Sequence, residues 1–180
     1  MLVRVLKRAK ELSQKGIVLP CSEPLLYFMQ HKVELNDFDD AVLERFSQLD
    51  DTDIIAALKA WQNHNDFILS NLSKMIVNRD LLKIKLSSEK YTPEDVEDLK
   101  SKLTNFYRIS QQEASYFIFK GKIKNQAYNK DVEPIKILKK DRTIEDVVEA
   151  SDQLNLKALS KPVTKYYLCF PKVLLEKAAF

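Results

Sequence analysis

Hydrophobic residues recur every three to four positions along the first 107 residues, and this spacing is typical of helices with one buried face. The clearest stripes are Ile54–Trp61 and Ile68–Ile76, and we expect the rest of the chain to be organised around these two helices. The turn between them, Gln62–Asn65, is short and polar, which predicts antiparallel neighbours, with Asn65 or Asp66 capping the second helix. Four further helices are predicted, at 1–13, 22–30, 36–49 and 93–107.

Short alternations of apolar and polar residues replace the helical spacing in much of the second half, and they indicate β-strands. Strands are predicted at 83–87, 135–138 and 163–170, with a strand pair or one bulged strand across 116–120 and 123–128. A turn at Lys139–Arg142 leads into a predicted short helix from Thr143 to about Ala150. The pattern as a whole predicts an α+β fold, a mainly helical bundle with a small antiparallel sheet in its C-terminal half. We place a soft boundary that separates a helical portion, 1–88, from an α+β portion, 89–180, within what can be one compact unit.

The composition is ordinary for a globular protein and excludes a glycine-rich phosphate loop. Hydrophobic residues make up 45% and charged residues 31% of the 180 positions, and the net charge of +3 is too small to argue for nucleic acid unaided. Two glycines leave no room for a glycine-rich phosphate loop. Cys21 and Cys169 are isolated, which favours buried thiols in a reducing compartment. No run reaches about 18 apolar residues, so we expect a cytoplasmic protein without a membrane partner.

The helical spacing of hydrophobic residues begins at the first residues of the sequence, and no capping residue precedes it. A helix that begins without a cap leaves its first N–H groups without partners. We therefore expect the chain to be a fragment of a longer protein, in which upstream residues continue or cover this helix.

A resemblance to a known family rests on two stretches of the sequence. FSQLDDTDIIAALKAWQNHNDFILSNLSKMIVNRDLLKI resembles the region after the catalytic core in bacterial HD-domain phosphohydrolases, which are related to the sterile-alpha-motif and HD-domain dNTP triphosphohydrolase. Within it, Asn78-Arg79-x-Leu81-x-Lys83 matches the family's (N/Y)R-x-L-(F/L)-K segment. The later run EASDQLNLKALSKPVTKYYLCFPK is similar to the C-terminal segment of the bacterial branch.

The resemblance implies a role in regulation and assembly for this region. In nucleotide-regulated relatives the matching Arg and Lys contact the phosphates of an activating nucleotide between subunits, and the matching Leu touches its base. This implicates Arg79, Leu81 and Lys83, with Asn78 as a weaker neighbour, although solvated charges at a helix end are an equally good interpretation. The implied partners are further copies of the chain, the upstream HD catalytic domain and a nucleotide. The full-length relative would use a divalent metal.

The sequence lacks the metal ligands on which the activity of that family depends. His31 and His64 are the two histidines, and neither is followed by the aspartate of an HD pair. Two isolated histidines cannot supply such a site, so we expect no cofactor in this chain and no activity from it alone. Asp50, Asp51 and Asp53 lack the glycine and glutamate of a calcium loop and are better interpreted as helix caps. The pair Glu145–Asp146 is interpreted in the same way.

A basic segment, Lys120–Arg142, leaves a second function open. It holds eight basic residues against three acids, with Tyr128 among them. Basic strands with an aromatic residue can bind single-stranded nucleic acid, which would make the chain an autonomous nucleic-acid-binding module. The preferred interpretation is a solvated sheet face whose lysines discourage edge-to-edge aggregation, because no RNA-binding signature is present.

Overall fold

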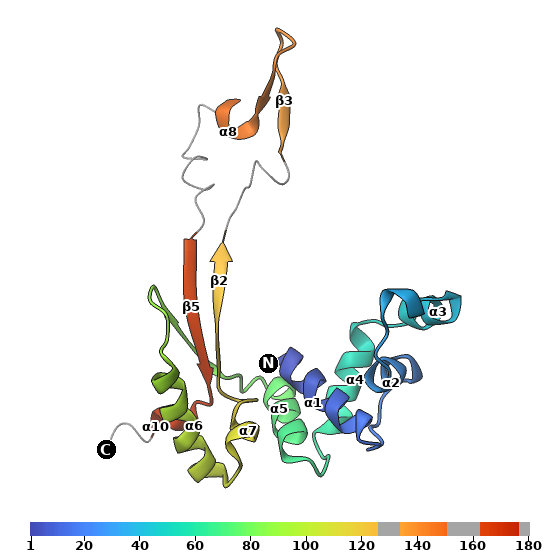
Figure 1. Cartoon of the computed structure of the whole chain (residues 1–180), viewed down its shortest axis with the longest axis vertical. Coiled ribbons are helices and arrows are strands. Elements are labelled where there is room, and N and C mark those ends of the chain that lie inside the picture. Colours follow the sequence, from blue (N-terminus) through green and yellow to red (C-terminus); the bar gives the residue numbers. More distant parts are fainter. Residues whose placement is uncertain (126–133, 151–162, 177–180) are drawn as a thin grey trace. The chain divides into compact units, whose positions relative to one another are not determined.

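The computed structural model describes residues 1–125, 134–150 and 163–176, and it confirms the predicted α+β fold (Figure 1). The helices are α1 (Leu2–Gln14), α2 (Glu23–Gln30), α3 (Asp40–Ser47), α4 (Asp51–Trp61), α5 (Phe67–Val77), α6 (Pro93–Tyr107), α7 (Gln111–Ala114), α8 (Val147–Ala150) and α10 (Val173–Glu176), with a 3-10 helix, η1 (Leu35–Asp37). The strands are β1 (Lys83–Ser87), β2 (Phe119–Asn125), β3 (Lys136–Leu138), β4 (Ile144–Asp146) and β5 (Val163–Phe170). Within the described ranges, no helix has both the length and the apolar composition needed to cross a membrane.

The chain forms two compact units, and neither is a continuous stretch of sequence. Unit 1 consists of Met1–Lys83, Val96–Phe119 and Cys169–Phe180. Unit 2 consists of Ile84–Asp95 and Lys120–Leu168. Whether 1–88 and 89–180 act as separate portions stays a prediction.

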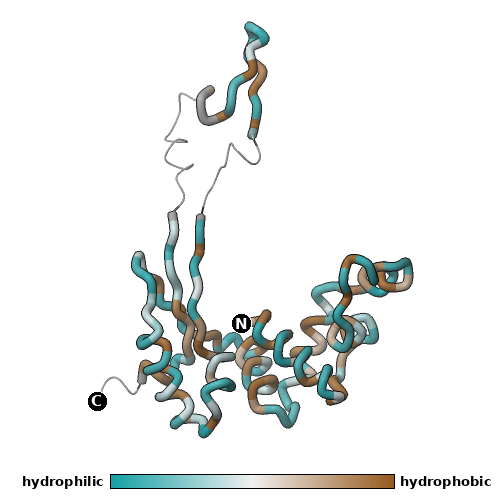
Figure 2. Tube along the Cα trace, in the orientation of Figure 1, coloured by the Kyte–Doolittle hydropathy of each residue, from teal (hydrophilic) through white to brown (hydrophobic). Residues whose placement is uncertain are grey.

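The core of unit 1 lies around the two central helices. Helix α4 packs on α5, and α1 packs on both α2 and α5. Trp61 of α4 and Ile68, Leu69 and Leu72 of α5 have no exposed surface, as the helical spacing of their hydrophobic residues predicts. Figure 2 shows the hydrophobic and hydrophilic stretches that alternate along the trace. The predicted stripe of α4 needs one change, because Ile55 is 52% exposed while Ala57 is buried.

The helix ends confirm most of the predicted caps. Asp50 accepts hydrogen bonds from the N–H groups of Thr52 and Asp53 at the start of α4, which is the capping interpretation of this acidic group. Helix α1 ends at Gln14, and Gly16, just after its C-cap, has φ +82°, a conformation that side chains disfavour. The Ile17 N–H donates back to the Leu12 carbonyl. These local bonds satisfy backbone groups that a helix end would otherwise leave unpaired.

One charged pair joins α1 to the first turn of α5. Arg8 donates to both carboxylate oxygens of Asp66, from Nη2 at 2.6 Å and from Nε at 3.1 Å. The Oδ1 atom of Asp66 also accepts from the Leu69 N–H at 2.9 Å, so Asp66 is the N-cap of α5. Burial opposes the charge on Asp66, but the hydrogen bonds from Arg8 and Leu69 outweigh it and lower the pKa of Asp66 below its usual value.

Two further side chains extend this pair towards the residues after α7. Arg8 Nη1 lies 3.4 Å from Glu11 Oε2, and the Tyr116 hydroxyl donates to the same Glu11 oxygen. Burial, together with this hydrogen bond, raises the pKa of Tyr116 to about 12, so its hydroxyl keeps its proton at neutral pH. Arg8, Glu11, Asp66 and Tyr116 are called the Arg8 network below.

Three predictions about local structure are wrong or need correction. The helix predicted at 36–49 is divided into η1 and α3, because Asp39 lies between them and caps α3 by accepting from Val42. The segment from Thr143 does not open as a helix; β4 pairs antiparallel with β3 first, so Glu145 and Asp146 lie in a strand and not in a cap. Across 116–128 the structure has one strand, β2, and the residues after 125 lie outside the described part.

The three-stranded sheet has the order β1-β5-β2, with β5 in the middle. Strands β2 and β5 run antiparallel (Figure 1). The predicted strands at 83–87 and 163–170 are confirmed in full, and Pro171 follows directly after the second. The turn predicted at Lys139–Arg142 is also confirmed, since it connects β3 to β4.

We predict that Asp66→Ala lowers the free energy of unfolding by about 3 kcal/mol, because it removes a cap and leaves the largely buried Arg8 guanidinium without its partner. The measurement is urea unfolding followed by the fluorescence of Trp61, the single tryptophan. The matched control is Asp98→Ala, which removes an equally short 2.6 Å pair, with Lys102, at an exposed site. That control should cost less than about 0.5 kcal/mol, and equal costs would contradict the assignment.

The pair also predicts a pH dependence. A carboxylate whose pKa is lowered by folding stabilises the protein above its unfolded pKa of about 4, and this contribution is lost as the pH falls through the folded pKa. The wild-type chain should therefore lose stability on acidification more steeply than Asp66→Asn. Identical pH profiles for the two proteins would show that Asp66 does not carry the effect.

Candidate functional site

The motif Asn78-Arg79-x-Leu81-x-Lys83 lies where α5 ends and the chain becomes extended. Asn78 is the C-cap of α5, and its N–H donates to the Lys74 carbonyl at 2.9 Å. Arg79 follows with φ +58°, a left-handed conformation that costs a non-glycine residue roughly 1–2 kcal/mol. This sharp turn is what directs the chain out of α5 and into β1 four residues later.

The side chains of the motif divide into exposed and buried positions. Arg79 and Lys83 are exposed, and Leu81 is 49% exposed. Leu82, between them, is buried, and its N–H lies 3.3 Å from the Met1 sulfur. In the described part of the chain, Arg79 and Lys83 make no ion pair and no side-chain hydrogen bond. Their charges are thus available to a ligand or a second chain.

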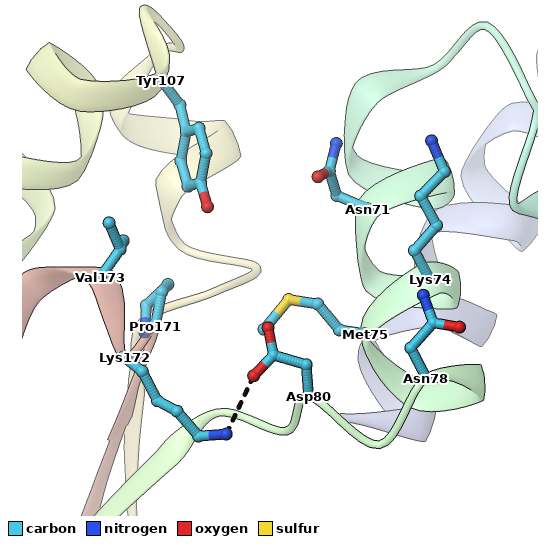
Figure 3. A pocket seen from close by; sticks show the side chains of 9 residues that line it. All are labelled: Asn71, Lys74, Met75, Asn78, Asp80, Tyr107, Pro171, Lys172 and Val173. Atoms are coloured by element: carbon cyan, nitrogen blue, oxygen red, sulfur yellow. Dashed lines mark hydrogen bonds and ion pairs between the residues drawn. The ribbon is translucent and has the colours of Figure 1, made fainter.

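Asn78 instead lines a pocket of about 230 Å³ in unit 1 (Figure 3). The other lining residues are Asn71, Lys74, Met75, Asp80, Tyr107, Pro171, Lys172 and Val173. Lys172 pairs with Asp80 at 2.9 Å, while Lys74 has no ion pair within the described residues. Two ammonium groups, two amides and a hydroxyl against one carboxylate give the pocket an excess of donors, which suits a small anion.

Tyr107 reaches this pocket from α6, and its hydroxyl points into the pocket (Figure 3). Burial raises the pKa of Tyr107, and the charge of Asp80 raises it further. The hydroxyl is therefore a neutral donor at physiological pH, which again favours an anion over a cation in this pocket.

The structure brings together residues that the motif alone did not reveal. Asn71, Lys74, Met75 and Asn78 are spaced i, i+3, i+4 and i+7 along α5, so a search for polar stripes could have found this side of the pocket. Lys172 lies 92 positions after Asp80 in the sequence, and only the tertiary fold places the two together. Of the four predicted residues, Asn78 lines the pocket and the other three do not, so their common role in binding a nucleotide stays a prediction.

The histidines have local partners. His31 stacks on Tyr27 with ring centres 4.4 Å apart, and its Nδ1 lies 3.0 Å from the Tyr27 carbonyl. His64 Nδ1 accepts from the Asp66 N–H at 2.9 Å, just before α5. Among the residues that the structure describes, no group of three or more His, Cys, Asp or Glu side chains could hold a metal ion. The described part of this chain therefore does not fit the divalent metal that the resemblance implies for the longer protein.

The two cysteines are free thiols in unit 1. Cys169 is buried and Cys21 is half-buried. Burial raises the pKa of both thiols, so each is mainly protonated and a poor nucleophile at neutral pH.

One comparison with a solved structure supports a phosphohydrolase relationship. No protein-family model matches the chain. A solved phosphohydrolase from Bacteroides thetaiotaomicron is 39% identical with a TM-score of 0.83, over 94% of this chain and 42% of that one. A hypothetical protein from Aquifex aeolicus is 18% identical with a TM-score of 0.45, over 98% of this chain and 38% of that one. The uncharacterized protein YwfO of Bacillus subtilis is 25% identical over 118 residues, which are 66% of this chain and 25% of that protein. The chain therefore has a phosphohydrolase-related fold and spans less than half the length of the relatives it matches.

Proposed function

We propose that the chain is the non-catalytic C-terminal region of an HD-domain, metal-dependent phosphohydrolase that acts on dNTPs, where it serves subunit assembly and nucleotide regulation. The observation that carries this proposal is the likeness to a phosphohydrolase over 94% of this chain but only 42% of that protein. The divalent metal would be held by residues outside this chain.

Nucleotide regulation is supported by the exposed cations of the motif. Arg79 and Lys83 have no partner among the described residues, and a guanidinium with a nearby ammonium suits the phosphates of a nucleotide. The left-handed turn at Arg79 costs free energy, and strain of this kind is often found at functional sites. Arg108 and Arg142 share this conformation, so it supports the proposal without singling out Arg79.

Assembly is supported by apolar side chains exposed on one segment of unit 1. Leu35, Phe38, Leu43 and Phe46, in and around η1 and α3, are 90%, 44%, 50% and 57% exposed. Contiguous exposed apolar surface often marks a protein interface. Within this segment the Phe38 and Phe46 rings contact each other edge-to-face, with centres 6.1 Å apart, so these two exposed side chains form one apolar surface.

The first prediction from this proposal concerns catalysis. The 180-residue chain should hydrolyse no dNTP with Mg²⁺, Mn²⁺ or Co²⁺, because its described residues supply no metal-ligand group. The measurement is release of triphosphate from each of the four dNTPs. Turnover that persists after repurification and disappears with a chelator would overturn the non-catalytic assignment.

The second prediction concerns the motif in the longer protein. Replacing Arg79 and Lys83 together by Ala should weaken nucleotide activation about a hundredfold, because two charge-assisted contacts of roughly 1.5 kcal/mol each are lost. The measurement is the nucleotide concentration needed for half-maximal activation.

The matched control for this variant replaces Arg108 and Lys15, which are exposed and without ion pairs in the described chain. Arg108 shares the left-handed conformation of Arg79, with φ +55°, so the control also reproduces any backbone effect. Lys139 is less suitable because it pairs with Glu145. If both double variants weaken activation equally, the effect comes from the loss of net charge alone, and the assignment of Arg79 and Lys83 to the site is wrong.

The third prediction concerns assembly. Leu35→Ser together with Leu43→Ser should shift the longer protein towards smaller species. The variant has less apolar side-chain area to bury when subunits associate, so association gains less free energy. Sedimentation velocity over a range of concentrations measures this change. Ile55→Ser, at a comparably exposed position of α4, is the control and should leave the oligomer unchanged. An unaltered oligomer in the double variant would exclude Leu35 and Leu43 from the interface.

A further inference from the structure

The three-stranded sheet of β1, β5 and β2 is basic throughout. Its strands carry six lysines and no aspartate or glutamate, and the lysines are Lys83, Lys85, Lys120, Lys122, Lys124 and Lys165. None of them makes an ion pair with another residue that the structure describes. Unpaired charges of one sign on one small sheet create a field that attracts polyanions.

Three of these lysines form a row along β2. Lys120, Lys122 and Lys124 alternate with Gly121 and Ile123, and alternate residues of a strand share one face. All three are exposed. Successive lysines on that face are separated by two residues, or about 7 Å, which is comparable to the phosphate repeat of an extended nucleic-acid strand.

Two tyrosines lie beside this row in a groove of about 250 Å³ within unit 2. The groove is lined by Lys90, Tyr91, Lys120, Gly121, Lys122 and Tyr166. Lys120 Nζ donates to the Tyr91 carbonyl at 2.7 Å, which holds the segment after β1 against β2. Tyr91 and Tyr166 are half-buried, so each is anchored at the groove while part of it stays accessible.

A close contact between β2 and β5, at Gly121 and Tyr167, fixes the position of the strands at the groove. A side chain at position 121 would overlap the ring and hydroxyl of Tyr167, with a carbon placed 2.7 Å from Tyr167 Cε1. Glycine at this position therefore lets the Tyr167 ring lie against β2. Tyr166 is the next residue on β5, so the same packing positions it at the groove.

We propose that this groove binds single-stranded nucleic acid, with the β2 lysines on phosphates and Tyr166 and Tyr91 against bases. Lysines that guard the edge strands against aggregation would account for the charges on β1 and β2, but not for two tyrosines and Lys90 in one groove. Tyrosine rings can stack on bases that are unpaired, whereas the bases of a duplex are already stacked on each other. The inference concerns unit 2 and is independent of the nucleotide site proposed at Arg79 and Lys83.

The test measures binding of the 180-residue chain to a fluorescein-labelled oligo(dT) of about 15 nucleotides, by anisotropy over a range of salt concentrations. Three phosphate contacts predict that the logarithm of the association constant falls with the logarithm of salt with a slope of about −2. Lys122→Gln with Lys124→Gln should reduce that slope by about 1.4 and weaken binding about 25-fold at 0.1 M salt. Both lysines are exposed and make no ion pair or side-chain hydrogen bond with the residues that the structure describes, so this variant should remain folded.

The charge control is Lys7→Gln with Lys15→Gln, which removes the same charge from exposed positions in unit 1. It should bind oligo(dT) within about twofold of wild type. For the ring, Tyr166→Phe keeps the stacking surface and should bind like wild type, while Tyr166→Leu should weaken binding about tenfold. Trp61 fluorescence and circular dichroism verify that each variant is folded.

Several results would overturn the proposal. These are absence of binding at low salt, an equal loss in both lysine variants, or equal binding by Tyr166→Leu and Tyr166→Phe. Equal competition by heparin, by a duplex of the same length or by anionic phospholipid vesicles would show that any polyanion suffices. Equal competition by dTTP would show that the groove takes a single nucleotide and not a strand. The assays of the Arg79/Lys83 variant are unaffected by any of these outcomes.

Discussion

The packing of unit 1 depends on a charged pair that is largely withdrawn from solvent. Arg8 and Asp66 are 17% and 15% exposed, and their two hydrogen bonds join α1 to the start of α5. Removing either partner would leave a charge without compensation in a site where water cannot replace the lost contact. The same carboxylate caps α5, so the position of α1 and the start of the central helix are set by one side chain.

The rest of unit 1 extends from that junction. Glu11 and Tyr116 continue the Arg8 network to the residues after α7, and Lys10 donates to the Phe28 carbonyl at 3.1 Å near the end of α2. Arg4 lies over the ring of Phe119, 4.7 Å from its centre. One face of α1 thus carries hydrophobic residues into the core, while its cations contact three other segments. The pocket at the end of α5 belongs to the same unit, so its lining residues are held by this packing.

Unit 2 is built differently. Among its described residues, Leu168 is the one large hydrophobic side chain that is buried. Ile84, Leu86 and Ile123 each expose half or more of their surface. Because this sheet buries so few side chains, its strands are held mainly by backbone pairing and by the contact between Gly121 and Tyr167. Lysines on both edge strands keep such a sheet soluble, and the same lysines give the groove beside Tyr166 its charge. Solubility and polyanion binding can therefore come from one set of residues.

The sequence by itself determined the features that depend on neighbouring residues. The cap at Asp50 and the strand at 163–170 follow from short-range chemistry, and both are where the sequence predicts them. The same holds for the cap of α5, where Asp66 is one of the two residues predicted. The prediction was wrong at Thr143, because pairing of β4 with β3 outweighed a good local helix start. It was incomplete at 36–49, where the helical spacing did not reveal the break between η1 and α3 and could not say whether another element covers Phe38 and Phe46.

Only the tertiary structure decided which distant residues share a site. Lys172 and Asp80, Arg8 and Asp66, and Lys120 and Tyr91 are brought together by packing between elements, and no spacing within one element encodes these pairs. The resemblance identified Asn78, Arg79, Leu81 and Lys83 as one motif, and all four are exposed, yet Asn78 lines the pocket and the other three do not. The physical reason is the left-handed turn at Arg79. It ends α5 and turns the chain towards β1, and sequence spacing alone does not reveal a left-handed residue at an arginine.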